Sequence, residues 1–94
     1  MPYIFEITDK SGRKIHLSHE RWRHIQKHPK MSNQLEQIKE TLENPNIIQD
    51  FEYDTNVKFY FRYYKKNREY LFVSVKYLNG GGFVITSFYT DKIK

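Results

Sequence analysis

Three of the four histidines lie within ten residues, in the segment HERWRHIQKHP (residues 19–29). An imidazole can ligate a metal, and it can also take up or release a proton near neutral pH. The same residues could instead be solvated side chains of a basic helix with no chemical role. The segment therefore allows a metal site, an acid–base site or a plain surface helix.

The spacing of these histidines argues against a metal site. His19 and Glu20 look like the start of a zinc-protease motif, but the next histidine is His24, five residues on. At about 100° per residue, side chains five positions apart lie about 140° apart around a helix and cannot share a metal. His24 and His28 could chelate zinc, although a third ligand would have to come from His16, Glu20 or a distant aspartate. The chain has no cysteine, and we expect neither a metal nor another cofactor.

An acid–base role fits the same helix better. Trp22 and Ile25 mark its apolar stripe. His24 lies about 130° from the centre of that stripe and His28 lies nearer its flank, so both can reach solvent and titrate. Cleaving RNA without a metal requires a base for the 2′-hydroxyl proton, an acid for the leaving 5′-oxygen and a cation near phosphorus. Two histidines, Lys76 and a strand hydroxyl would suffice.

The composition favours a nucleic-acid partner. The net charge is +5 with histidine counted as neutral, and 17% of the residues are aromatic. Lysine and arginine neutralise phosphates, and aromatic rings stack on unpaired bases. A positive surface can also simply keep a protein soluble, and aromatic residues in strands commonly serve core packing.

Alternation within the strands predicts an exposed RNA-binding face. Lys76 lies between apolar neighbours in mid-strand, where lysine is unfavourable unless it has a role or protects an edge. We expect it to lie beside cationic and hydroxylated side chains of the neighbouring strands. These RNA-binding candidates are Arg62, Tyr60, Tyr64 and Tyr89. Thr86 is the hydroxyl expected in the site, although a register slip of one residue would replace it with Ser87.

The remaining pattern predicts a single domain over residues 1–94. The expected elements follow in chain order: strands at 3–8 and 13–17, helices at 19–27 and 31–43, and strands at 47–51, 57–64, 69–78 and 83–90. This order predicts an α+β fold in which two N-terminal helices pack on one face of an antiparallel β-meander sheet.

Nothing in the sequence indicates a membrane protein. No apolar stretch approaches the roughly 18–20 residues that a membrane helix needs. The first residues lack a basic leader followed by an apolar run. We therefore expect a cytoplasmic protein with no membrane partner.

Four segments resemble phage-type nuclease-like proteins of the barnase–EndoU–colicin–RelE superfamily: LSHERWRHIQKHPKM, ENPNII, FVSVKY and GFVITSFYT. The resemblance covers about residues 15–92. It implies a barnase- or RelE-like fold and metal-independent RNA cleavage, often as a toxin. By position, the residues of the family motif fall on His24 and His28 in the helix, Lys76 in a strand and Thr86 in the last strand.

The residues and the resemblance together favour a metal-independent endoribonuclease or nuclease-like toxin. Its partners would be RNA and an acidic antitoxin or immunity protein. The alternative is a non-catalytic RNA- or protein-binding domain of a toxin–antitoxin or phage system, because a fold does not secure an activity. The chain departs from the family's pattern at Lys30, where an acid is usual, and at Phe88, where a tyrosine is usual.

Overall fold

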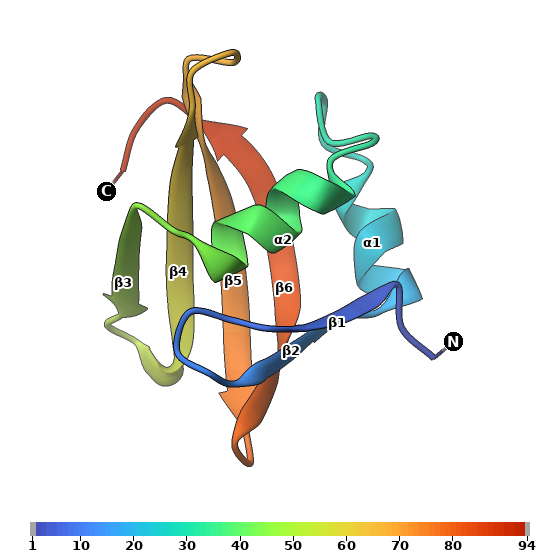
Figure 1. The fold of residues 1–94 in the computed structure, drawn as a ribbon, viewed down its shortest axis with the longest axis vertical. Helices are drawn as coiled ribbons and strands as arrows, with labels where there is room; N and C mark the ends of the chain where they lie inside the picture. Colours follow the sequence, from blue (N-terminus) through green and yellow to red (C-terminus); the bar gives the residue numbers. More distant parts are fainter. Residues whose placement is uncertain (1, 94) are drawn as a thin grey trace.

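A computed structural model describes residues 2–93, which form six strands and two short helices (Figure 1). The elements are β1 (Phe5–Thr8), β2 (Lys14–Leu17), α1 (His19–Ile25), α2 (Leu35–Glu43), β3 (Ile47–Phe51), β4 (Asp54–Tyr64), β5 (Glu69–Leu78) and β6 (Gly81–Thr90). They make one sheet in the order β1-β2-β6-β5-β4-β3. β2 runs parallel to β6, and the other neighbouring strands are antiparallel.

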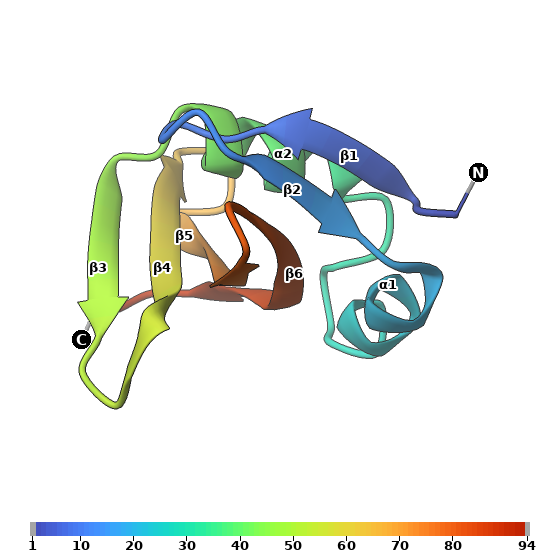
Figure 2. The same cartoon turned by 90° about the horizontal axis from the view of Figure 1, so that it is seen from below.

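The predicted fold class was wrong. The structure is a six-stranded mixed sheet with helices of only 7 and 9 residues, not two helices on an antiparallel meander. The β1–β2 hairpin and α2 lie together on one side of β4–β6, and α1 lies beside β6 (Figure 2). Local alternation identifies individual strands, but the parallel pairing of His16 with Phe83 joins residues that are distant in sequence. No local pattern reports such a pairing.

Short-range signals explain how α1 begins and ends. Ser18 has an extended backbone, and its hydroxyl accepts a hydrogen bond from the backbone N–H of Arg21 at 3.1 Å. This N-cap satisfies a donor that the first helical turn would otherwise leave unpaired. At the other end, Pro29 disfavours helical backbone at His28, and the helix ends at Ile25. None of the helices within residues 2–93 is long and apolar enough to cross a membrane.

The hydrophobic core lies between β4–β6 and the layer made by the hairpin and the helices. Apolar side chains from both layers fill it with almost no exposed surface: Ile15, Leu17, Ile25, Ile38, Leu42, Leu71, Val73, Val75 and Val84. Because every second residue of β5 enters this core, the intervening residues point to the opposite face of the sheet.

A buried carboxylate anchors the hairpin to the sheet. Asp9, in the β1–β2 turn, is 5% exposed. Its Oδ2 accepts a 3.0 Å hydrogen bond from the Tyr60 hydroxyl and a second bond from the Tyr77 hydroxyl. Its Oδ1 accepts from the Ser11 hydroxyl at 2.6 Å and from the Arg13 backbone N–H at 3.1 Å. The Arg13 guanidinium also lies 3.4 Å from the centre of the Tyr77 ring. The turn is thereby fixed to both β4 and β5.

These contacts determine the ionisation of Asp9. Burial raises the pKa of its carboxyl, but hydrogen bonds from Ser11, Tyr77, Arg13 and Tyr60 outweigh burial and leave the pKa below its ordinary value. Since the pKa is lowered on folding, the carboxylate stabilises the protein above the unfolded-state value of about 3.9. That stabilisation is lost as the pH falls through the lower, folded-state pKa.

We expect Asp9→Asn to reduce the free energy of unfolding at pH 7 by about 2 kcal/mol, because charge-assisted hydrogen bonds to buried donors are lost. Urea unfolding of both proteins measures the difference, which should narrow as the pH falls through the folded-state pKa of Asp9. Asp50→Asn is the control, since the Asp50 side chain is 78% exposed and pairs with Lys58 at the surface. Equal stability of Asp9→Asn and the wild type at pH 7 would contradict this account of the hairpin anchor.

The β5–β6 hairpin depends on glycine for two different reasons. Asn79 and Gly80 form its two-residue turn with φ values of 53° and 87°. Gly82 lies at a close approach instead, because a Cβ there would lie 2.5 Å from the Lys76 carbonyl oxygen. Gly82 pairs with Ile15 of β2 on one side and with Tyr77 of β5 on the other. One of the two residue pairs that join β2 to β6, Ile15 with Gly82, therefore lies where β6 has no side chain.

We expect Gly82→Ala to lower the free energy of unfolding by about 1–3 kcal/mol, since a rigid backbone carbonyl must move to admit the methyl group. Urea unfolding measures this loss. Thr55→Ala, at an exposed position of β4, serves as the control and should change stability by less than about 0.5 kcal/mol. A Gly82→Ala protein as stable as the control variant would show that β6 has room at this position.

Candidate active site

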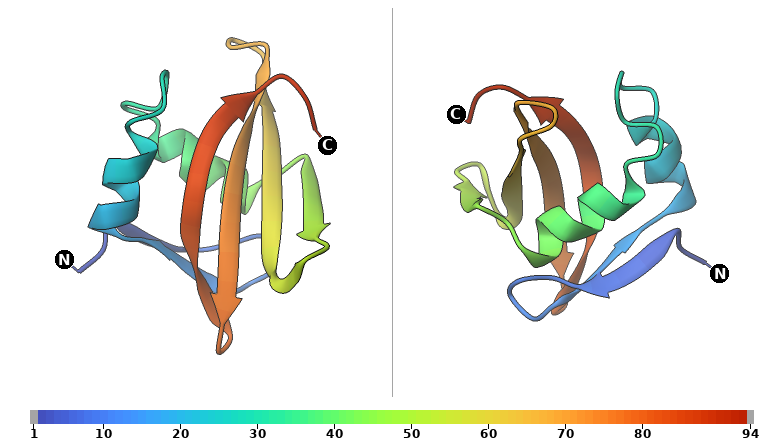
Figure 3. Two further views of the ribbon diagram at one scale, coloured as in Figure 1. Left: turned by 180° about the vertical axis from the view of Figure 1, so that it is seen from behind. Right: turned by 45° about the horizontal axis from the view of Figure 1, so that its top comes forward.

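One face of the sheet carries no helix or strand within residues 2–93. The left view of Figure 3 shows β6, β5, β4 and β3 from behind, with this face uncovered. We call it the outer face. Its β4, β5 and β6 side chains are Val57, Phe59, Phe61, Tyr63, Tyr70, Phe72, Ser74, Lys76, Phe83, Thr86, Phe88 and Thr90.

A β-bulge decides which hydroxyl of β6 reaches the outer face. Val75 pairs with Val84 and Ser74 pairs with Thr86, so Ile85 is an extra residue in β6. This extra residue places Thr86 on the outer face beside Ser74. Ser87 turns inward, is fully buried and donates its hydroxyl proton to the Phe72 carbonyl at 2.7 Å. The structure thus places Thr86, not Ser87, on the uncovered face.

Lys76 shares the outer face with Thr86. Lys76 pairs with Phe83, and the next outward-facing residue of β5, Ser74, pairs with Thr86. The Lys76 ammonium donates a 3.0 Å hydrogen bond to Asp54 at the start of β4. This hydrogen bond is the main reason why the pKa of Asp54 lies below its ordinary value. No sequence pattern singles out Asp54, because its pairing with Lys76 depends on the β4–β5 register.

His28 reaches the edge of the outer face, whereas His24 stays on the helix surface. The His28 ring lies 5.5 Å from the Phe88 ring, centre to centre, at an angle of 46°. His28 and Phe88 also border a shallow hollow with Pro29, Lys30 and Tyr89. His24 is exposed on α1, and none of the contacts described for residues 2–93 joins it to Lys76 or Thr86. The structure therefore brings three of the four predicted catalytic residues toward one face.

The predicted RNA-binding residues lie on the inner face of the sheet, opposite Lys76. Tyr60 is 1% exposed and belongs to the Asp9 network. The Arg62 guanidinium donates to the Asn44 carbonyl at 2.7 Å. The Tyr64 hydroxyl donates to Glu40 at 2.6 Å, and burial is the main cause of the raised pKa of this tyrosine. The expectation that these three residues share an exposed face with Lys76 was therefore wrong, since the β4–β5 register sets them opposite it.

Tyr89 is likewise turned toward the helices. Its hydroxyl donates to the Gln34 side chain at 2.5 Å, and its ring packs against the buried core. Alternation along a strand separates two faces, but it does not say which face the helices cover. Here the tyrosine hydroxyls find hydrogen-bond partners on α2 and its flanks, and this favours the inward orientation.

His16, which the sequence offers only as a candidate metal ligand, lies on the outward side of β2. His16 stacks on Tyr3 with ring centres 3.9 Å apart, and its ring lies 6.1 Å from that of Phe83. Phe83 in turn pairs with Lys76, so His16 lies on the same row of the sheet. Within residues 2–93, no group of three or more His, Asp or Glu side chains is arranged to hold a metal ion.

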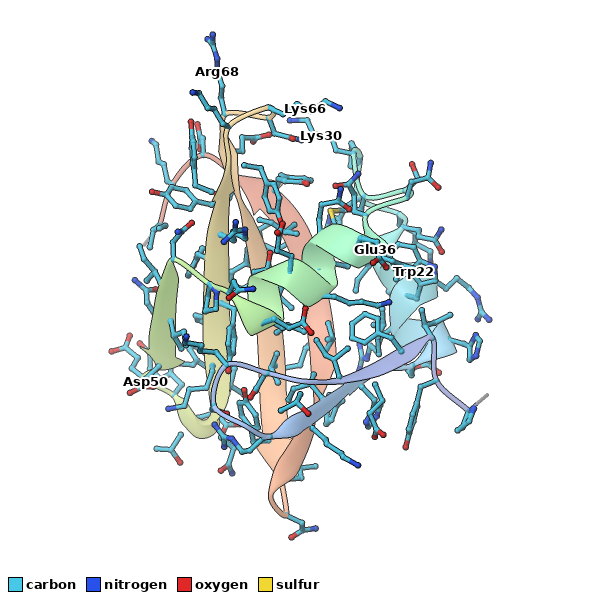
Figure 4. The ribbon with its side chains drawn as sticks, viewed as in Figure 1. Trp22, Lys30, Glu36, Asp50, Lys66 and Arg68 are labelled. Atoms are coloured by element: carbon cyan, nitrogen blue, oxygen red, sulfur yellow. The ribbon has the colours of Figure 1, made fainter. Side chains whose placement is uncertain are left out.

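Positive charge gathers at one end of the molecule. Lys30, Lys66 and Arg68 lie at this end (Figure 4). The Lys30 ammonium is 2.6 Å from a Glu69 carboxylate oxygen, an ion pair that joins the segment after α1 to the β4–β5 hairpin. Such a cluster beside the outer face is suited to bind the phosphates of a nucleic-acid strand.

The comparisons with known proteins identify a family for the chain. Residues 5–94 match the model of a protein family described as phage-Barnase-EndoU-ColicinE5/D-RelE like nuclease. No curated protein and no solved structure matches the chain significantly. Because the family model spans nearly the whole sequence, the chain belongs to this phage-type family of barnase–EndoU–colicin–RelE-like nucleases.

Proposed function

We propose that this protein is a metal-independent endoribonuclease whose RNA substrate lies across the outer face of the sheet. One observation carries the proposal. In a chain of a nuclease family, the Ile85 bulge and the strand register place Thr86 and Lys76 on the outer face, with His28 at its edge. A base, a cation and a hydroxyl are the groups that cleavage of a phosphodiester without a metal needs.

The reaction would use the RNA's own 2′-oxygen as the nucleophile. One histidine of the pair His24 and His28 takes the 2′-hydroxyl proton as the 2′-oxygen attacks phosphorus. The other histidine donates a proton to the 5′-oxygen as its bond to phosphorus breaks, which leaves a 2′,3′-cyclic phosphate and a free 5′-hydroxyl. Lys76 stabilises the charge that builds on the phosphoryl oxygens. Thr86 orients the phosphate by a hydrogen bond.

Two features of the site favour a second candidate, a non-catalytic RNA-binding domain. Lys76 is already paired with Asp54, so a phosphate must compete with a carboxylate for its ammonium. His24 lies on the helix surface, exposed to solvent. A module that only binds RNA needs neither a free cation nor a second histidine at the scissile bond. An acidic antitoxin or immunity protein would suit the positive charge at the end of the molecule that carries Lys30, Lys66 and Arg68 in both cases.

We expect the purified protein to cleave bulk cellular RNA in excess EDTA. Replacing His28 by alanine should slow cleavage by about 10²–10⁴-fold, the range for loss of a general acid or base. Lys76→Ala should slow it by about 10²-fold, because charge at phosphorus loses its stabilisation. Initial rates from gel-resolved, end-labelled RNA measure both effects.

Lys58→Ala is the matched control for Lys76→Ala. Lys58 lies on β4, one residue after Val57, which pairs with Lys76 across the strands. Like Lys76, it forms an ion pair with an aspartate, Asp50. Its side chain points to the opposite face of the sheet, so its loss should leave the cleavage rate unchanged. Cleavage by the double variant His24→Ala, Lys76→Ala at the wild-type rate would overturn the catalytic proposal. Salt-sensitive RNA binding that survives loss of both histidines, without cleavage, would establish the binding domain instead.

A further inference from the structure

The outer face contains an apolar cavity that the catalytic residues do not occupy. It has a volume of about 330 Å³, in the size range of small-molecule sites. Its lining residues are Gln49, Phe59, Phe61, Phe72, Phe88, Thr90 and Lys92. Four phenylalanines thus form its wall, and an amide, a hydroxyl and an ammonium group lie among them.

The four aromatic rings form one continuous group around Phe72. Its ring centre lies 4.8 Å from that of Phe88, 5.1 Å from that of Phe59 and 5.3 Å from that of Phe61. The rings are tilted by 34° to 55° to one another. They belong to three neighbouring strands, and the sheet holds their backbones at a fixed spacing. The cavity wall is therefore preformed.

The rings that line the cavity are phenylalanines, whereas the outer-face tyrosines, Tyr63 and Tyr70, lie outside its lining. Hydroxyl-bearing rings on the inner face, those of Tyr60, Tyr64, Tyr77 and Tyr89, each form a hydrogen bond in the protein interior. The cavity on the uncovered face is lined by phenylalanine, whose ring gains nothing from contact with water. Phe61 is buried and the other three rings are partly exposed. An apolar hollow with a few polar groups at its border is typical of a ligand site.

The polar groups at the cavity define what fits it. Gln49 carries an amide that can both donate and accept hydrogen bonds, as the edge of a nucleobase does. The Thr90 hydroxyl donates to the Lys92 carbonyl at 3.1 Å and accepts from the Lys92 N–H at 3.3 Å. These bonds hold the segment after β6 beside the cavity, so that the Lys92 ammonium is available to a phosphate.

Phe88 connects this cavity to the candidate active site. One side of its ring faces Phe72 in the cavity wall, and the His28 ring lies near it at the edge of the sheet. Thr86 lies two residues before Phe88 on the same face of β6. Through Phe88, the cavity therefore borders the part of the outer face where His28 and Thr86 lie.

We propose that the cavity is a nucleobase subsite, which takes one unpaired base of the RNA strand next to the phosphate that is cleaved. The phenylalanine rings stack on the base, the Gln49 amide hydrogen-bonds its polar edge, and Lys92 contacts the flanking phosphate. The net charge of +5 favours a polyanionic ligand over an apolar peptide that carries no acidic residues. This subsite deepens the proposed function and rests on it.

The test measures binding of short fluorescent 2′-O-methyl RNA, which has no free 2′-hydroxyl and cannot be cleaved by the proposed mechanism. A matched strand with abasic positions provides the same phosphates without bases. Fluorescence anisotropy gives the Kd of the wild type, Phe59→Leu, Phe72→Leu and Tyr63→Leu. Tyr63 is the control, since it is an aromatic residue on the same face of β4 that does not line the cavity. Circular dichroism and urea unfolding confirm that each variant is folded.

We expect Phe59→Leu and Phe72→Leu each to weaken binding of the base-bearing strand by about tenfold, the effect of losing one stacking contact. Both variants should bind the abasic strand with the Kd of the wild type. Tyr63→Leu should bind the base-bearing and the abasic strand with the Kd values of the wild type. Gln49→Leu should reduce the differences in Kd between strands of adenine, cytosine, guanine and uracil. If Phe72→Leu fails to fold, the result for Phe59→Leu decides.

Cleavage of ordinary RNA by the wild type, measured in parallel, separates the two proposals. Equal wild-type affinity for the base-bearing and abasic strands would overturn the subsite. If the wild type still cleaves RNA in that case, the proposed nuclease function stands, and the cavity would suit a protein partner instead. Base-dependent affinity without cleavage would uphold the subsite and overturn the catalytic role. A wild type that neither binds nor cleaves RNA would overturn both.

Discussion

The rest of the structure depends on the burial of one charge, the carboxylate of Asp9. A carboxylate at 5% exposure would be costly without partners, but hydroxyl and backbone donors from the turn, β4 and β5 surround it. The backbone N–H of Lys10, next in the chain, donates to the Leu42 carbonyl of α2 at 2.9 Å. The hairpin and α2 thus become one layer over the inner face. Because that layer uses the short hairpin and both helices, the described chain has nothing left to cover the outer face.

A single extra residue then decides the chemistry of that outer face. Without Ile85 as a bulge, regular alternation would carry Ser87 outward and Thr86 into the core. With the bulge, the buried Ser87 hydroxyl bonds the Phe72 carbonyl, and Thr86 lies on the same face as Lys76. β-bulges commonly redirect side chains near functional sites, at the cost of one unpaired ladder position. The bulge and the Lys76–Phe83 pairing together place the polar side chains of Ser74, Lys76 and Thr86 on the same part of the outer face.

The sequence was sufficient to predict the elements but not their arrangement. Every strand and helix lies close to its predicted position, because alternation, Ser18 as a cap and Pro29 as a terminator are local signals. The parallel pairing of β2 with β6 is non-local, and the predicted meander therefore missed it. Alternation also divided β4 correctly into two sets of residues, yet it could not say which set the helices cover. Arg62 was therefore expected beside Lys76 and instead contacts the end of α2. The phenylalanine cavity was not predicted, because aromatic residues in strands most often pack in the core.

The core side and the cavity use different aromatic residues of β4–β6, with tyrosines on the inner face and phenylalanines around the cavity, while Tyr63 and Tyr70 lie on the outer face outside the cavity lining. Tyrosine on the inner face combines apolar area with a hydroxyl, and each hydroxyl has an acceptor on the turn or on α2 that makes its burial tolerable. Phenylalanine on the outer face needs no acceptor, so its ring can meet a flat ligand without losing a hydrogen bond. On the inner face, the hydroxyls of Tyr60, Tyr64, Tyr77 and Tyr89 are paired within the protein. On the outer face, Phe72 and its neighbours leave apolar surface toward solvent beside His28, Thr86 and Lys76. In the proposed function, a strand of RNA would supply both partners, a base for the rings and a phosphate for the polar groups.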